Sequence, residues 1–166
     1  MASSGRSDRD ELVQRAARHL RTLGATVDLF TEAAAEQLGV NVTDVQCLNI
    51  IHEIGSPTAG ELATRTGLTS GTITGVIDRL EQAGYVQRRS DPADRRRVRL
   101  VPTAEAGRQA QRIFWPILEA ASRDYSVYSE DQLRLIIEFL ERTQALLANE
   151  TRTLRVRRGN ETNGDS

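Results

Sequence analysis

Cysteine and histidine are scarce in this chain of 166 residues, which contains one cysteine and two histidines. A single cysteine cannot form a disulfide within the chain. Cys47 lies in a helix predicted to begin at Thr43, with Gln46 at its third position, and we expect a buried, inert thiol. His19 and His52 are the only imidazoles, and neither belongs to a recognisable nucleophile or metal-binding motif. The sequence therefore favours neither an enzyme nor a metal site nor a bound cofactor.

Lysine and long apolar runs are absent. All 22 basic residues are arginine, so an arginine-rich segment is not by itself evidence of a function. No apolar run approaches the roughly 18 residues that suggest a membrane-spanning helix, and no apolar signal-peptide core is present. We therefore expect a cytoplasmic protein without a membrane partner. Residues 1–166 should form one domain, with disorder over 1–7 and 157–166, which are small or polar.

The most informative segment is residues 85–101, which predicts two short strands around a turn. Arg97-Val98-Arg99-Leu100 alternates charged and apolar residues, as a half-buried strand does. Asp91-Pro92-Ala93-Asp94 is a turn sequence, because proline presets φ and the carboxylates bond nearby N–H groups. Residues 86–100 carry six arginines against two aspartates, a net +4 in a chain of net charge −1. A positive hairpin indicates a polyanionic partner; a solvated charged hairpin is the alternative.

Two short helices are predicted immediately before this hairpin. Thr58 and Glu61 form a capping box that begins the first helix, and Gly67 ends it. Thr69-Ser70 caps the second helix, which continues over residues 71–83. Two helices around a glycine-containing corner are typical of a helix-turn-helix. Together with the basic hairpin they predict a winged helix-turn-helix.

The second helix has an apolar side and a side of small and polar residues. Four residues at helical spacing should pack inward: Ile73, Val76, Ile77 and Leu80. Those expected to face DNA are Ser70, Gly71, Thr72, Thr74, Gly75 and the flanking Arg79. Each glycine costs a helix about 1 kcal/mol relative to alanine; close approach to a groove would compensate, and mere tolerance is the alternative. Asp78 either accepts from a cytosine amino group or pairs with a nearby arginine such as Arg79.

The chain resembles the MarR family of bacterial transcriptional regulators from about Val40 to Leu100. The resemblance is carried by Gly75-Val76-Ile77-Asp78-Arg79-Leu80-Glu81-Gln82-Ala83-Gly84-Tyr85-Val86-Gln87-Arg88 and by Asp91-Pro92-Ala93-Asp94-Arg95-Arg96. The expected fold is mainly α with a small β-hairpin wing, in which residues 43–101 form the winged helix-turn-helix. After the wing the chain departs from the family's Leu-Thr-x-x-Gly pattern, with Leu100-Val101-Pro102-Thr103-Ala104-Glu105-Ala106-Gly107.

The family resemblance implies roles for the hairpin. Its tip arginine corresponds to Arg95 or Arg96, expected to enter a minor groove, with Asp94 holding the guanidinium in a charge-assisted pair. A planar guanidinium suits a narrow A·T-rich minor groove, where negative potential concentrates, better than a hydrated ammonium. The hairpin residues expected at the DNA are Asp94, Arg95, Arg96 and Arg97.

The remaining helices are predicted to join two such modules. Residues 8–37 and 104–155 carry apolar residues at helical spacing. The last helix is apolar on two sides, more than a surface helix needs, so we expect dimerisation, as the resemblance also implies. The residues expected to dimerise are Leu12, Leu20, Leu133, Ile136, Ile137, Leu140 and Leu147.

These observations predict a homodimeric transcriptional regulator, a repressor, that grips one pseudo-palindromic site in double-stranded DNA. The alternative is a winged helix whose arginines meet an acidic protein surface. A small aromatic or apolar effector is also predicted, contacted by Phe30, His52 and Trp115. A constitutive DNA binder whose helix junction is filled by side chains is the alternative to that effector.

Overall fold

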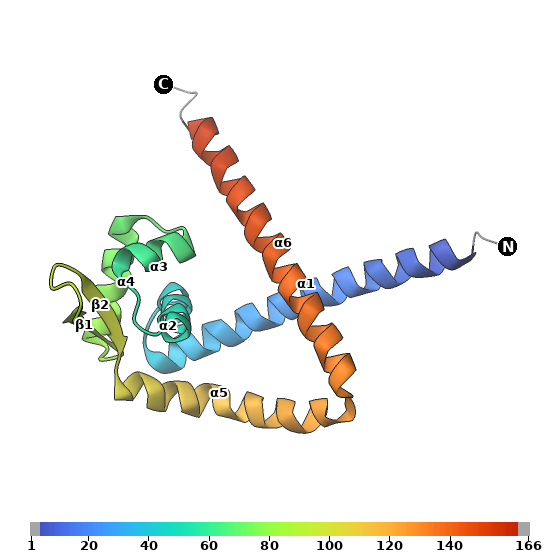
Figure 1. Cartoon of the computed structure of the whole chain (residues 1–166), viewed down its shortest axis with the longest axis horizontal. Helices are drawn as coiled ribbons and strands as arrows, with labels where there is room; N and C mark the ends of the chain where they lie inside the picture. The colour runs from blue at the N-terminus through green and yellow to red at the C-terminus, as the bar shows by residue number, and fades with distance from the viewer. Residues whose placement is uncertain (1–3, 163–166) are drawn as a thin grey trace. The chain divides into compact units, whose positions relative to one another are not determined.

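The structure is a computed structural model that describes residues 4–162, with side chains described over 8–155. The chain divides into two compact units, Met1–Trp115 and Pro116–Ser166. The elements in chain order are α1 (Ser4–Leu38), α2 (Val42–Ile54), α3 (Ala59–Thr66), α4 (Ser70–Gln82), β1 (Val86–Ser90), β2 (Val98–Pro102), α5 (Ala104–Asp124), a short 3-10 helix (Tyr125–Val127) and α6 (Glu130–Thr162) (Figure 1). The predicted fold class, mainly α with a small β-hairpin, is confirmed.

Helices α2, α3 and α4 form the helix-turn-helix lobe of the first unit (Figure 1). At the start of α3 the Glu61 N–H donates to Thr58 Oγ1 at 3.2 Å, and the Thr58 N–H donates to Glu61 Oε2 at 2.7 Å. Gly67 ends α3 with φ of +65°, a left-handed conformation that glycine adopts without steric cost. Helix α4 follows Thr69, whose Oγ1 accepts from the Thr72 N–H at 3.2 Å. Both helix starts and the glycine corner lie where the sequence predicts them.

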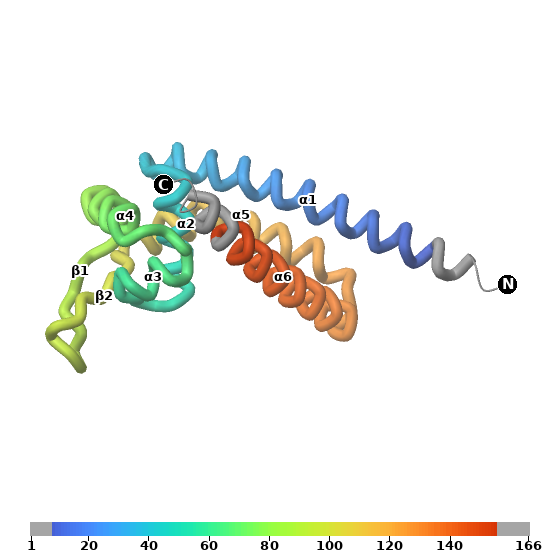
Figure 2. The backbone as a smooth tube through the Cα atoms, turned by 90° about the horizontal axis from the view of Figure 1, so that it is seen from above, coloured from blue at the N-terminus to red at the C-terminus, as the bar shows by residue number. Residues whose placement is uncertain are grey.

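The β-hairpin follows α4 directly. Strands β1 and β2 pair antiparallel in a register that places Arg88 opposite Leu100. The connecting turn projects away from α3 and α4 (Figure 2). We call residues 86–102 the wing and residues 91–97 its tip. The two strands predicted from the alternating pattern and the turn sequence are confirmed.

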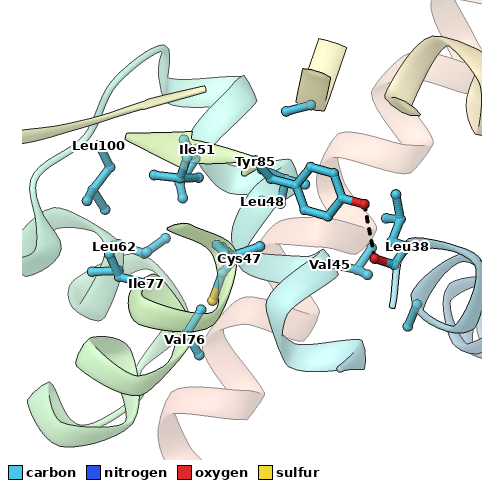
Figure 3. Close-up of a cluster of buried hydrophobic side chains, with 14 of the residues drawn as sticks. Leu38, Val45, Cys47, Leu48, Ile51, Leu62, Val76, Ile77, Tyr85 and Leu100 are labelled. Carbon is cyan, nitrogen blue, oxygen red and sulfur yellow. Dashed lines mark hydrogen bonds between the residues drawn. The ribbon is translucent and has the colours of Figure 1, made fainter. Parts of the chain in front are cut away.

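The core of the first unit gathers around α2 and the inner side of α4 (Figure 3). All four residues of α4 that the sequence assigns to the packing side are at most 2% exposed: Ile73, Val76, Ile77 and Leu80. The Tyr85 hydroxyl donates to the Leu38 carbonyl at 3.0 Å, which ties the chain before β1 to the end of α1. The helix-turn-helix is therefore packed through one side of α4, and the opposite side remains free for a partner.

The start of α2 differs from the prediction. The helix begins at Val42, and the N–H of Asn41 donates to Asp44 Oδ2 at 3.1 Å. The cap predicted at Thr43, with Gln46 at the third position, is therefore wrong. The carboxylate of Asp44 has further partners in the folded chain, described below, and these favour the earlier start.

The terminal helices enter the segments for which the sequence predicts disorder. Helix α1 begins at Ser4 and α6 continues to Thr162. The side chains of residues 1–7 and 156–166 lie outside the described residues. The disorder expected over residues 1–7 and 157–166 therefore stays a prediction.

The second unit consists of the end of α5, the 3-10 helix and α6. Ser129 and Gln132 cap α6, because the Ser129 N–H donates to Gln132 Oε1 at 2.8 Å. Apolar side chains on both sides of α6 are exposed. Those at least 38% exposed are Leu135, Ile136, Ile137, Phe139, Leu140, Leu146, Leu147 and Leu154. The two apolar sides expected from the sequence thus remain uncovered in a single chain.

The thiol of Cys47 supports a first testable prediction. Its side chain is fully buried, and burial, reinforced by the neighbouring Asp44 carboxylate, raises the pKa of Cys47 to about 11. Because the thiolate is the reactive form, the raised pKa keeps the unreactive thiol through neutral and mildly alkaline pH. We expect a disulfide reagent such as DTNB to label the native protein very slowly and the protein denatured in guanidinium at once. Rapid labelling of the native protein would contradict the buried, inert thiol.

Candidate nucleic-acid interface

The outward side of α4 is made of small and hydroxyl side chains. Ser70, Gly71, Thr72 and Thr74 are exposed and Gly75 is half-buried. Thr74 Oγ1 donates to the Ser70 carbonyl at 2.9 Å, while the Thr69 and Thr72 hydroxyls lie 2.8 Å apart. These residues line one side of the helix, opposite the four buried ones. They leave a low surface on which few side chains stand between the helix backbone and a partner.

The two glycines of α4 have no packing role inside the chain. A Cβ added at Gly71 would meet no atom within 4 Å. A Cβ added at Gly75 would meet Arg79 Nη1, the end of a long side chain, at 3.4 Å. Neither position has positive φ, so the backbone does not require glycine either. The cost of two glycines in one helix is therefore not offset by any contact within the described chain.

The guanidinium of Arg79 is bonded within the protein, although the side chain is 44% exposed. Its Nε donates to Asp44 Oδ2 at 2.9 Å and its Nη2 donates to Asp44 Oδ1 at 2.7 Å. Asp44 is fully buried, and this bidentate pair raises the pKa of Arg79. The guanidinium thus compensates a buried charge and joins α4 to the start of α2. Sequence reasoning missed Asp44, because nothing near it in sequence indicates a partner 35 residues away.

Asp78 is paired, but not with the arginine that the sequence suggests. Arg88 Nη2 on β1 donates to Asp78 Oδ1 at 2.6 Å, and the same guanidinium bonds Glu81. The pairing of Asp78 with Arg79 is therefore wrong. Because Asp78 lies on the outward side of α4, Arg88 partly neutralises a carboxylate that would otherwise repel a polyanion.

The wing tip presents arginines with free guanidinium groups. Arg95 and Arg96 are exposed, and over residues 8–155 their guanidinium groups have no hydrogen-bond or ion-pair partner. Asp94 accepts from the Arg96 backbone N–H at 3.0 Å and lies 3.6 Å from Arg97 Nε. The expectation that Asp94 holds the guanidinium of Arg95 or Arg96 is therefore wrong for the free chain. The tip thus offers two unpaired positive groups in the same lobe as the low surface of α4.

A family model described as MarR family matches residues 40–98, which run from just before α2 to the start of β2. The uncharacterized HTH-type transcriptional regulator YcgE of Bacillus subtilis is 40% identical to this chain over 152 residues, which are 92% of this chain and 99% of that protein. This chain belongs to the MarR family. The residues that the family model spans include the helix-turn-helix and the wing tip.

Further similarities fit the same MarR-family assignment. The HTH-type transcriptional repressor YetL of Bacillus subtilis is 31% identical over 85 residues, 51% of this chain and 50% of that protein. The solved structure of a MarR family protein from Bacillus stearothermophilus superposes with a TM-score of 0.64 at 19% identity, covering 84% of this chain and 97% of that one. At 19% identity this superposition is evidence for the fold alone, and the fold of the two chains is the same.

The residues predicted to contact an effector line none of three hollows in the described part of this MarR-family chain. Phe30 packs edge-to-face on Phe114 at a centroid distance of 5.6 Å. His52 is exposed, and Trp115 is 56% exposed. Hollows of about 350, 370 and 420 Å³ occur in the described part of the chain, and other residues line all three. The effector therefore stays a prediction.

The described part of this MarR-family chain holds neither a cluster of metal ligands nor a membrane-spanning helix. Among the residues that the structure describes, no three His, Cys, Asp or Glu side chains come together as metal ligands would. Over the same residues, none of the helices combines the length and the apolar character needed to cross a bilayer.

Proposed function

We propose that this MarR-family regulator is a sequence-specific repressor that binds double-stranded DNA as a homodimer in the cytoplasm. The observation that carries the proposal is the pairing of two surfaces in one lobe. The low side of α4 exposes Ser70, Thr72 and Thr74 around two glycines, and the wing tip of the same lobe carries two free guanidinium groups. Repression is favoured by the name of the relative YetL, a transcriptional repressor.

The exposed side of α4 suits the major groove. B-DNA admits a helix there, and serine and threonine hydroxyls bond base edges or phosphates while a threonine methyl contacts thymine. The glycines reduce the height of the helix surface, so the backbone approaches the groove closely. Arg79 does not supply a free guanidinium to the groove, because that group is bonded to Asp44; it instead fixes α4 to the start of α2.

The wing suits the neighbouring minor groove. Its tip extends from the lobe (Figure 2) and presents Arg95 and Arg96 without internal partners. Narrow minor grooves attract such guanidinium groups through their enhanced negative potential. An acidic protein surface would attract the same charges, but it would not explain a glycine-lined helix beside them.

The dimer is supported by apolar surface on α1 and on α6. In α1, Leu12 is 61% exposed and Leu20 is half-buried; in α6, Leu133 is half-buried while Ile137 and Leu147 are more than half exposed. Large apolar side chains in such numbers exceed the scattered ones of a monomeric surface. We assign them to contact with a second copy, which would set two α4 helices about one DNA turn, roughly 34–36 Å, apart.

The wing gives the direct test of this proposal. Changing Arg95 and Arg96 together to alanine should weaken binding to the operator by about 1–3 kcal/mol for each lost contact. It should also make the dependence of log affinity on log salt concentration shallower by about two for each wing, roughly four for the dimer. Folding should not change, since both side chains are exposed. Fluorescence anisotropy with duplexes from the region upstream of the gene itself, over a salt series, measures both quantities.

A matched control removes the same charge elsewhere. Arg134 and Arg142 are exposed on α6 and pair with carboxylates of their own helix. The Arg134→Ala/Arg142→Ala variant should bind the operator nearly as the natural chain does. Operator affinity that is unaltered by the wing substitutions would remove the minor-groove assignment.

A further inference from the structure

The side chain of Arg99 joins the wing to the helix-turn-helix. Its Nε donates to Asp91 Oδ2 at 2.7 Å, and its Nη1 donates to the Ser56 carbonyl at 3.2 Å. The same Nη1 lies 3.7 Å from Glu61 Oε2. The three partners belong to the wing tip, to the corner between α2 and α3, and to the first turn of α3. One guanidinium therefore connects the wing tip to a stretch of the helix-turn-helix that lies far from it in sequence.

The wing tip has little apolar support. Val86 and Leu100 are the buried residues of the two strands, and both lie towards the base of the wing, whereas Val98 at the tip end is 47% exposed. The Leu100 N–H donates to the Pro57 carbonyl at 2.8 Å, which fixes the middle of β2. A two-stranded hairpin is at best marginally stable by itself in water. The direction of the tip must therefore depend on polar contacts at its base.

Asp91 serves this junction, although its charge is unfavourable for binding DNA. Its side chain is almost fully buried, and Oδ1 accepts from the Ala93 N–H at 2.8 Å while Oδ2 accepts from Arg99. The Asp91 N–H donates to the Arg97 carbonyl at 2.9 Å, closing the turn. The Ala93 N–H, and after it Arg99, hold the pKa of Asp91 below its usual range, so the carboxylate is ionised at neutral pH. If charge alone decided affinity, this carboxylate would weaken binding to phosphates.

We propose that Asp91 and Arg99 are positioning residues for DNA binding, which fix the wing to the α2–α3 corner and thereby direct Arg95 and Arg96 into the groove. The proposal rests on the assignment of the wing to DNA. Asp91 and Arg99 do not need to touch DNA themselves, yet they control how much Arg95 and Arg96 contribute to binding. Both act through the geometry of the tip.

Asp91→Asn tests the proposal through the sign of its effect. The amide keeps an oxygen for the Ala93 N–H but no longer supplies a second acceptor and a negative charge to Arg99. If net charge alone determined the affinity for DNA, removing this negative charge should tighten binding. Positioning predicts the opposite, a loss of about tenfold, the size of one wing contact. Glu53→Gln, an exposed carboxylate paired with Arg65 on the helices of the lobe, is the charge control and should not weaken binding.

Arg99 is tested by a double-mutant cycle with the wing tip. Arg99→Met keeps the stem and loses the charge, whereas Arg99→Lys keeps the charge and loses the planar fork. Both should lose about tenfold in operator affinity in the natural chain. Neither should lose more when Arg95 and Arg96 are already alanine, because no tip contact remains to be directed. A phosphate contact by Arg99 itself would instead be retained largely by lysine and lost additively by methionine.

The outcomes separate this inference from the proposed function. If Arg95→Ala/Arg96→Ala leaves affinity unchanged, the wing assignment fails first. Suppose instead that the Arg95→Ala/Arg96→Ala variant binds weakly but Asp91→Asn and both Arg99 variants bind like the natural chain; the positioning role is then overturned. It is also overturned if the affinity losses of the Asp91 and Arg99 variants add to the loss caused by Arg95→Ala/Arg96→Ala. Thermal unfolding monitored by circular dichroism accompanies each variant. Should Asp91→Asn fail to fold, the Arg99→Lys cycle decides alone.

Discussion

Replacing Gly75 with leucine should abolish specific binding to the operator while leaving the protein folded. The helix itself should gain slightly, because glycine in a helix interior costs about 1 kcal/mol relative to alanine and leucine is a good helix former. The Cβ of the new side chain would meet only the end of Arg79 within 4 Å. It would, however, stand on the low side of α4 and hold the helix backbone away from the groove. Anisotropy with operator and unrelated duplexes, together with the thermal unfolding midpoint, measures both effects.

The same substitution at another open glycine provides the control. Gly107 on α5 is exposed, and a Cβ there would meet no atom within 4 Å. Gly107→Leu should keep specific binding and gain comparable helix stability. A Gly75→Leu protein that still discriminated operator from unrelated DNA would show that this side of α4 does not face the groove.

Introducing aspartate at Ile137 should convert the dimer into monomers. In the single chain Ile137 is 53% exposed, so an aspartate there has water around it. In a dimer that covers this side of α6 the carboxylate would be buried without a partner, which costs several kcal/mol. Sedimentation velocity at micromolar concentration should show the natural chain as a dimer and Ile137→Asp as a monomer. The operator affinity of Ile137→Asp should also fall, because a monomer binds one half-site at a time, whereas the two linked lobes of a dimer bind both half-sites together.

The control variant carries the same charge at a position turned away from Ile137. Asn149 is exposed and lies twelve residues from Ile137, which rotates it by about 120° around the helix. Asn149→Asp should remain dimeric and bind the operator normally. A natural chain that sediments as a monomer at micromolar concentration would contradict dimerisation through α6, and a dimeric Ile137→Asp would place the contact elsewhere.

The local elements of the lobe could be predicted from sequence because their signals are local. The capping box at Thr58, the corner at Gly67 and the apolar spacing of α4 each involve residues within a few positions of one another. The start of α2 could not be predicted in this way. The cap predicted at Thr43 lies two residues after Asn41, which precedes the helix in the structure. The earlier start depends on Asp44, whose second partner Arg79 is brought near only by folding.

The charged pairs of the site show the same limit. Arginines are frequent in this chain, so each carboxylate had several candidate partners nearby in sequence. Asp78 instead bonds Arg88 across the α4–β1 junction, and Asp91 bonds Arg99 across the hairpin. The packing of α4 against β1 decides the first pair and the pairing of the two strands decides the second, and both follow from the folded lobe rather than from any short motif.

The empty space around Gly71 bears on how such a protein changes over generations. A Cβ added there would meet no atom within 4 Å, so small substitutions at this position should carry no penalty from the core. Stability is carried by the buried side of the same helix, while the proposed function assigns the choice of DNA sequence to its outer side. After a gene duplication, two copies of this lobe can acquire different operators by changes at the outer positions alone, and the interior needs no compensating substitution.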